Sequence, residues 1–164
     1  MFKIELMALK PGDIAPDFSL FDSAKNKVTL SDLKGHNVLL LFFPVAFTST
    51  CTKELCSVRD NLSVYDNADA KVFGISVDAL YSLAKFKEEQ NLNFPLLSDF
   101  NKSASRAYGS IYEDWNYDMK GVSKRSAFVI DGKGVIRYAE VLENAGQIPD
   151  FQAIQDTLSE LHPK

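Results

Sequence analysis

Short apolar runs bounded by turn residues recur along the chain and predict β-strands. The run at 38–43 is apolar at every position, which is typical of a central strand covered on both faces. Asp131-Gly132-Lys133-Gly134 separates two apolar segments and favours a hairpin, and a second hairpin is expected around the polar stretch 22–26. The expected strands lie at 2–6, 18–20, 27–30, 38–43, 71–77, 93–99, 127–130 and 135–139.

Helical periodicity appears between these runs. The longest helix is expected from about Ser49 to Tyr65, where five residues at helical spacing share one face: Cys51, Leu55, Val58, Leu62 and Tyr65. On this helix Cys56 lies about 140° around from Cys51, on the side of the polar residues. Further helices are expected at 79–90, 102–108 and 149–161, with a helical turn at 31–35 and an irregular aromatic loop at 111–121.

The order of these elements predicts an α/β fold. Strands and helices alternate first, and a β-hairpin and a final helix follow, which together favour a central mixed β-sheet flanked by helices on both faces. This is the order of the thioredoxin-like fold, here with an N-terminal β-hairpin extension. A length of 164 residues without repeats or linkers favours a single domain over 1–164, with a core at about 9–162.

Composition narrows the class of protein. Hydrophobic residues make up 46% of the chain and charged residues 24%, which is ordinary for a globular protein. A net charge of −4 without a basic stretch argues against a nucleic-acid binder. The apolar runs are too short to span a membrane, and the N-terminus lacks a signal-peptide pattern. We therefore expect a cytoplasmic protein that binds neither membrane nor nucleic acid.

The chain has only two cysteines, Cys51 and Cys56. A zinc site is disfavoured because the spacing is not Cys-x-x-Cys and the only histidines are His36 and His162. Most free cysteines are buried as small hydrophobic residues, but Cys51 falls in the first turn of its predicted helix. There the helix dipole and free amide groups favour a thiolate, which is the reactive form of cysteine. Reactive thiol chemistry is therefore the leading hypothesis.

The segment Pro44-x-x-x-Thr48-x-x-Cys51 resembles the peroxidatic motif of the peroxiredoxins, the AhpC/TSA superfamily. Residues 12–20 resemble the opening of that family, and Arg59-Asp60 closes the cysteine helix as family members do. Arg125, two residues before the predicted strand at 127–130, resembles the distant active-site arginine. These matches span nearly the whole chain in the family's order.

The resemblance implies a role for each residue of the motif. Cys51 would be the peroxidatic thiolate, which attacks a peroxide oxygen and becomes a sulfenic acid. Thr48 would hydrogen-bond the peroxide, Arg125 would stabilise charge on the leaving oxygen, and Pro44 would shape and shield the pocket. From the residues alone, Thr48 could instead be a helix cap and Arg125 a solvated charge before a strand. Glu54 and Arg59 are expected to be helix-surface charges.

The Cys51–Cys56 spacing matches the subgroup called PrxQ or bacterioferritin comigratory protein, in which the second cysteine resolves the sulfenic acid. On a continuous helix the two Cα atoms would be roughly 8–9 Å apart. A disulfide tolerates at most about 7 Å, so the helix must unwind locally. Before Cys51 stand Ser49 and Thr50 where PrxQ members commonly have Pro-Gly, a feature that resembles the AhpE-like branch.

The function implied is a thiol-dependent peroxidase that reduces hydrogen peroxide and organic hydroperoxides. Its reductant would be thioredoxin-like or glutaredoxin-like, it would need no cofactor or metal, and it would be a monomer or a homodimer. Three alternatives remain at this point: a one-cysteine mechanism with an external thiol, a dithiol–disulfide oxidoreductase, and a peroxide-sensing redox switch. The oxidoreductase would be expected to carry Cys-x-x-Cys, which Cys51 and Cys56 do not form.

Overall fold

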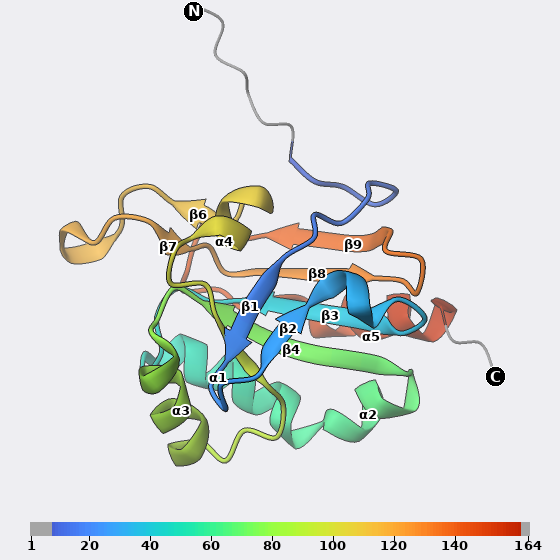
Figure 1. Cartoon of the computed structure of the whole chain (residues 1–164), viewed down its shortest axis with the longest axis horizontal. Coiled ribbons are helices and arrows are strands. Elements are labelled where there is room, and N and C mark those ends of the chain that lie inside the picture. The colour runs from blue at the N-terminus through green and yellow to red at the C-terminus, as the bar shows by residue number, and fades with distance from the viewer. Residues whose placement is uncertain (1–7, 162–164) are drawn as a thin grey trace, which may run out of the picture.

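The computed structural model describes residues 8–161, so the strand expected at 2–6 lies outside the described residues. Its main feature is a seven-stranded sheet in the order β2-β1-β5-β4-β3-β8-β9 (Figure 1). The strands of this sheet are β1 (Ser19–Asp22), β2 (Lys27–Thr29), β3 (Asn37–Phe42), β4 (Ala70–Ser76), β5 (Leu96–Ser98), β8 (Ser126–Ile130) and β9 (Ile136–Val141).

The sheet is mixed, as the order of elements predicts. β3, β4 and β5 run parallel, whereas β8 pairs antiparallel with both β3 and β9, and β1 pairs antiparallel with β5. The two expected hairpins are both present, one joining β1 to β2 and the other β8 to β9. The prediction of a mixed sheet with an N-terminal hairpin is confirmed.

The central strand β3 is buried at every position and divides the core into two clusters. Leu39 and Leu41 point into a cluster that lies under α1, α2, α3 and α5. Leu40 and Phe42 point to the opposite face, where the N-terminal hairpin and α4 cover them. Because successive side chains of a strand alternate between faces, one apolar run fills both layers.

Helices cover both faces of the sheet. The long helix expected at 49–65 is wrong in one respect: it is two helices, because Asn61 leaves the helical region with φ −124° and ψ 22°. The predicted apolar face is nevertheless buried at Leu55, Val58 and Tyr65. The α-helices are α1 (Ser49–Asp60), α2 (Leu62–Asn67), α3 (Leu80–Glu89), α4 (Ser103–Ala107) and α5 (Phe151–Leu161), and η1 (Leu30–Leu33) is a short 3₁₀ turn.

The segment 111–121, expected to be an irregular loop, contains regular structure. Strand β6 (Ile111–Tyr112) pairs with β7 (Val122–Ser123), and the 3₁₀ turn η2 (Asn116–Asp118) lies between them. Two-residue strands are too short to give a recognisable alternation, which is why the pattern indicates only a loop. Within residues 8–161, no helix combines the length and apolarity that a membrane crossing requires.

Candidate active site

The loop that links β3 to α1 is fixed by hydrogen bonds at its start and in its middle. The amide of Phe43 still donates to the carbonyl of Ile75 at 2.9 Å, but Pro44 has no N–H and the strand pairing stops there. Pro44 is buried. Two residues later, the amide of Ala46 donates to Oδ2 of Asp78 at 2.9 Å. This loop therefore has a defined path into α1.

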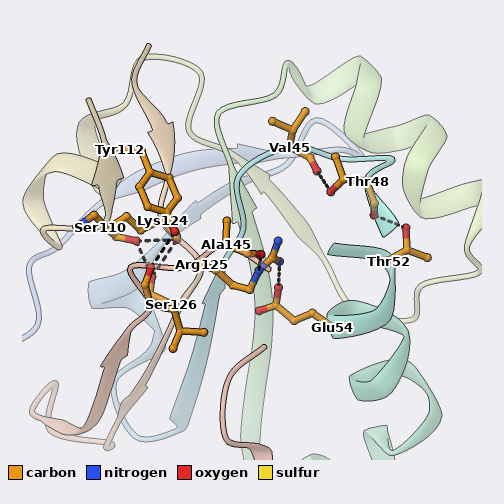
Figure 2. Close-up of polar contacts among 11 residues, drawn as sticks. Val45, Thr48, Thr52, Glu54, Ser110, Tyr112, Lys124, Arg125, Ser126 and Ala145 are labelled. Atoms are coloured by element: carbon orange, nitrogen blue, oxygen red, sulfur yellow. Dashed lines mark hydrogen bonds and ion pairs between the residues drawn. The ribbon is translucent and has the colours of Figure 1, made fainter. Parts of the chain in front are cut away.

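Thr48 is the N-cap residue of α1, but its side chain does not cap the helix. Its hydroxyl donates to the carbonyl of Val45 at 3.1 Å (Figure 2). Of the cap that the sequence allows, the structure thus shows the N-cap position of Thr48 but no capping hydrogen bond from its side chain. Its main-chain carbonyl accepts from both the amide and the hydroxyl of Thr52, each at 3.0 Å. The Thr48 hydroxyl therefore donates its proton within the loop, and the hydroxyl oxygen can still accept a hydrogen bond.

Cys51 is the third residue of α1, which begins at Ser49. The first amide groups of a helix have no acceptor within the helix and carry the positive end of its dipole. Cys51 thus lies in the first turn of its helix, as the sequence predicts.

Arg125 reaches the same helix from the strand layer. Its side chain is 2% exposed, so the alternative of a solvated charge before a strand is wrong. Nε donates to the carbonyl of Ala145 at 2.9 Å, and Nη1 donates to Oε2 of Glu54 at 2.7 Å (Figure 2). The guanidinium is therefore held within one helical turn of residue 51, because Glu54 follows Cys51 by three positions.

Glu54 is the clearest error of the sequence analysis at this site. We expected a surface charge, yet its side chain is fully buried and forms an ion pair with Arg125. Its Oε1 has no hydrogen-bond partner among the residues that the structure describes. Burial raises the pKa of this carboxyl to about 7, although the Arg125 charge acts in the opposite direction. The carboxyl therefore titrates near neutral pH beside a cation that does not titrate.

The backbone around Arg125 is fixed by a small buried network. The amide of Leu142 donates to the Arg125 carbonyl at 2.9 Å. The hydroxyls of Ser110 and Ser126 lie 2.5 Å apart, and that of Ser110 also donates to the carbonyl of Lys124 at 2.9 Å (Figure 2). Because these groups are buried and paired, they hold the start of β8 in one position.

Cys56 lies in the same continuous helix as Cys51, one and a half turns further along. Like Arg59, which was expected on the same side of the helix, it contacts Gln90, and it is partly buried against the core cluster beneath α1. Its thiol donates to Oε1 of Gln90 at 3.7 Å. The structure therefore shows Cys56 tethered to the end of α3.

A pocket of about 440 Å³ opens beside the first turn of α1. One wall is the helix itself, and the other is the loop that follows Ala145, whose carbonyl holds Arg125. Solvent and small solutes can thus reach the first turn of α1, which contains Cys51. The lining residues are Ser49, Thr50, Lys53, Gly146, Gln147 and Ile148.

Sequence reasoning missed three groups that shape this site: the Glu54 carboxyl and the carbonyls of Val45 and Ala145. The carbonyls leave no trace in a sequence. Glu54 could have been found from the sequence, because it follows Cys51 by three positions and therefore lies on the same side of the helix.

Comparison with known proteins matches residues 11–139 to the AhpC/TSA family. Alkyl hydroperoxide reductase E of Mycobacterium tuberculosis is 38% identical over 156 residues, which cover 93% of this chain and 98% of that protein. Peroxiredoxin Bcp of Escherichia coli is 40% identical over 132 residues, covering 79% and 84%. The crystal structure of peroxidoxin BcpB from M. tuberculosis matches with a TM-score of 0.83 and 30% identity, covering 93% and 98%.

The fold is thus the thioredoxin-like fold of a thiol peroxidase. The chain belongs to the AhpC/TSA family, as the resemblance in its sequence implies. It is a PrxQ/BCP-like peroxiredoxin, and hence an enzyme of the peroxidase class.

Proposed function

We propose that this enzyme reduces hydrogen peroxide and organic hydroperoxides through a sulfenic acid on Cys51. One observation supports this most directly: the buried Arg125–Glu54 pair, at 2.7 Å (Figure 2), holds a cation against α1 within one helical turn of residue 51. A buried cation and a helix N-terminus both favour an anion, and a thiolate is the form of cysteine that attacks peroxide.

In the proposed reaction, the Cys51 thiolate attacks one oxygen of the peroxide, and the O–O bond breaks. The sulfur gains that oxygen and becomes a sulfenic acid, while the other oxygen leaves as hydroxide or alkoxide and takes up a proton. The Thr48 hydroxyl, whose proton goes to Val45, accepts a hydrogen bond from the peroxide and aligns it. Arg125 stabilises the charge on the leaving oxygen, and buried Pro44 keeps water from the thiolate.

Cys56 resolves the sulfenic acid in the second step. The Cys56 thiol loses its proton and its thiolate attacks the Cys51 sulfur; the S–O bond breaks, a disulfide forms, and the hydroxide that leaves takes up a proton to become water. Residues five apart on a continuous helix have Cα atoms roughly 8–9 Å apart, beyond the roughly 7 Å that a disulfide tolerates. Because α1 is continuous from Ser49 to Asp60, part of it must unwind first. A thioredoxin-like or glutaredoxin-like dithiol then reduces the disulfide and is itself oxidised.

The mass of the protein after one equivalent of hydrogen peroxide tests this proposal. Wild type should lose two hydrogens, because both thiols become a disulfide. Cys56→Ser should gain one oxygen, because the sulfenic acid on Cys51 then has no resolving partner. Trapping with a sulfenic-acid reagent and peptide mapping should place that oxygen on Cys51.

Two other outcomes would contradict parts of the proposal. If wild type and Cys56→Ser gain oxygen alike, Cys56 takes no part and an external thiol resolves Cys51. If neither protein reacts within seconds, the peroxidase mechanism on Cys51 is wrong. Cys51→Ser is the matched control and should leave the mass unchanged.

Replacing Thr48 by valine should lower the second-order rate constant with hydrogen peroxide about tenfold. Valine has nearly the same shape but can neither donate to Val45 nor accept from the peroxide, and one such hydrogen bond accounts for about a factor of ten. Thr48→Ser keeps the hydroxyl and should retain most of the rate. Stopped-flow measurement of the reduced proteins checks this, and equal rates for the valine and serine variants would contradict the role of the hydroxyl.

A further inference from the structure

Three hydrogen bonds join the C-terminal half of α1 to the end of α3 and to the segment that follows α3. The Cys56 thiol donates to Oε1 of Gln90 at 3.7 Å, and Nη1 of Arg59 donates to the carbonyl of the same Gln90. Nδ2 of Asn93 donates to the Arg59 carbonyl at 3.2 Å. We call Cys56, Arg59, Gln90 and Asn93 the α1–α3 clasp.

The clasp opposes the movement that the proposed resolution step requires. Cys56 must approach Cys51 by at least 1–2 Å between Cα atoms, on the geometry of a continuous helix and a disulfide. It can do so only if α1 unwinds, and the thiol then leaves Gln90. The contact also needs the neutral thiol as a donor, whereas attack on a sulfenic acid needs the thiolate. Contact and attack therefore exclude each other.

The clasp also contains a positive charge, that of Arg59, which interacts with Cys56. The pKa of Arg59 is raised, chiefly by its hydrogen bond to Asp60 and also by interaction with Cys56, so its guanidinium lies within electrostatic reach of that sulfur. Gln90 lies at the C-terminal end of α3, where its amide donates to the Phe86 carbonyl at 3.0 Å. Gln90 is therefore itself fixed and can hold the thiol in place.

We infer that Gln90 is a positioning residue that holds Cys56 away from Cys51 and thereby sets how long the sulfenic acid survives before the disulfide forms. This rests on the proposed function of the two cysteines. A longer-lived sulfenic acid is more exposed to a second peroxide, which converts it to a sulfinic acid. Gln90 thus governs both the rate of resolution and the sensitivity to overoxidation.

Two substitutions of Gln90 should act in opposite directions. Gln90→Ala leaves the main-chain carbonyl that binds Arg59 and removes the side-chain acceptor for Cys56. The disulfide should therefore form about two- to fivefold faster, because a thiol is a weak donor and its hydrogen bond lies at the low end of the usual range. Gln90→Glu supplies a charged acceptor, which binds the thiol more strongly and opposes the thiolate, so resolution should be slower than in wild type. Rapid quenching with an alkylating reagent, followed by mass spectrometry, measures both.

The matched control is Glu89→Ala, one residue earlier on α3, where the side chain is exposed and pairs only loosely with Lys85 at 4.0 Å. It should resolve at the wild-type rate. The rate of the first oxidation should be the same in all four proteins, which a general loss of structure would not allow. Under excess peroxide the sulfinic fraction should fall in Gln90→Ala and rise in Gln90→Glu. Equal resolution rates in Gln90→Ala and Glu89→Ala would overturn the inference.

Hydrogen exchange of the reduced protein tests the clasp without any peroxide. The amides at 55–60 should exchange faster in Gln90→Ala than in wild type and Glu89→Ala, and unchanged protection would also overturn the inference. If wild type forms no disulfide although these amides respond as expected, the proposed resolving role of Cys56 fails, and the tether itself stands.

Discussion

Replacing Arg125 by methionine should lower the second-order rate constant for peroxide reduction by about 10²–10³-fold, the usual cost of losing one fixed donor to a developing oxyanion. The guanidinium is buried, and both Ala145 and Glu54 orient it, so no solvent reorganisation is needed when charge appears on the leaving oxygen. Arg125→Lys keeps the charge without the planar fork and should recover only part of the rate. The rate constants of these variants can be measured from peroxide consumption with excess reductant and from single-turnover oxidation.

The neighbouring Lys124 provides the matched control. It is also a cation before β8, but its ammonium binds the exposed carboxylate of Glu143 at 2.6 Å and makes no described contact with α1. Lys124→Met should change the rate by no more than about twofold, because this ammonium pairs with Glu143 and not with a residue of α1. Equal rates for Lys124→Met and Arg125→Met would contradict the role of Arg125. Thermal unfolding should show Arg125→Met still folded, since Glu54, with its raised pKa, can bind a proton once its partner is lost.

The parts of the fold that the sequence predicts are those in which a single residue pattern determines the structure. β3 is uniformly apolar because both of its faces are covered, and the turn at 131–134 is glycine-rich because Gly134 has a φ of +83°. The break at Asn61 was not predictable in this way. The apolar spacing continues across it from Val58 to Tyr65, so the periodicity hides a change in backbone direction.

The candidate site shows the same limit. The positions of Pro44, Thr48 and Cys51 follow from their order along one strand, loop and helix. The partners of Arg125 do not, because Glu54 and Ala145 lie 71 and 20 residues away in the chain. A glutamate on a helix is usually solvated, and only the arrival of a buried cation from another element makes its burial tolerable. The surface assignment of Glu54 failed because it rested on local pattern alone.

Replacing Glu54 by alanine should lower the free energy of unfolding by about 3–5 kcal/mol, because it removes the carboxylate that offsets the burial of the Arg125 charge. Arg125 would lose its ion pair with Glu54, and a cavity would form beneath α1. Urea denaturation at pH 7 measures this. Glu143→Ala removes an exposed carboxylate that also pairs with a cation, and it should cost at most about 1 kcal/mol. Similar losses in the two variants would contradict the buried-pair argument.

Glu54 should also make the stability depend on pH in a direction opposite to that of most carboxylates. Its pKa is about 7 in the folded protein against an ordinary 4.5, so the folded state binds this proton more tightly than the unfolded state does. Its contribution to stability is then largest below about pH 4.5, falls as the pH rises to about 7, and is constant above that. Between these pH values the free energy of unfolding should fall by roughly 3 kcal/mol, since one pKa unit corresponds to about 1.36 kcal/mol. Asp13 and Asp131, whose pKa values are lowered, lose their contributions only at more acidic pH.

The variant Glu54→Gln isolates the contribution of Glu54 to the pH dependence of stability. The amide keeps an oxygen for Arg125 but stays neutral at every pH, so the variant should lack the fall in stability between about pH 5 and pH 7 that wild type shows. Urea denaturation of both proteins at half-unit steps from pH 5 to 8 measures the difference in their free energies of unfolding. Parallel curves would mean that Glu54 stays ionised throughout. In that case the Arg125 charge, and not burial, would decide the state of this carboxyl.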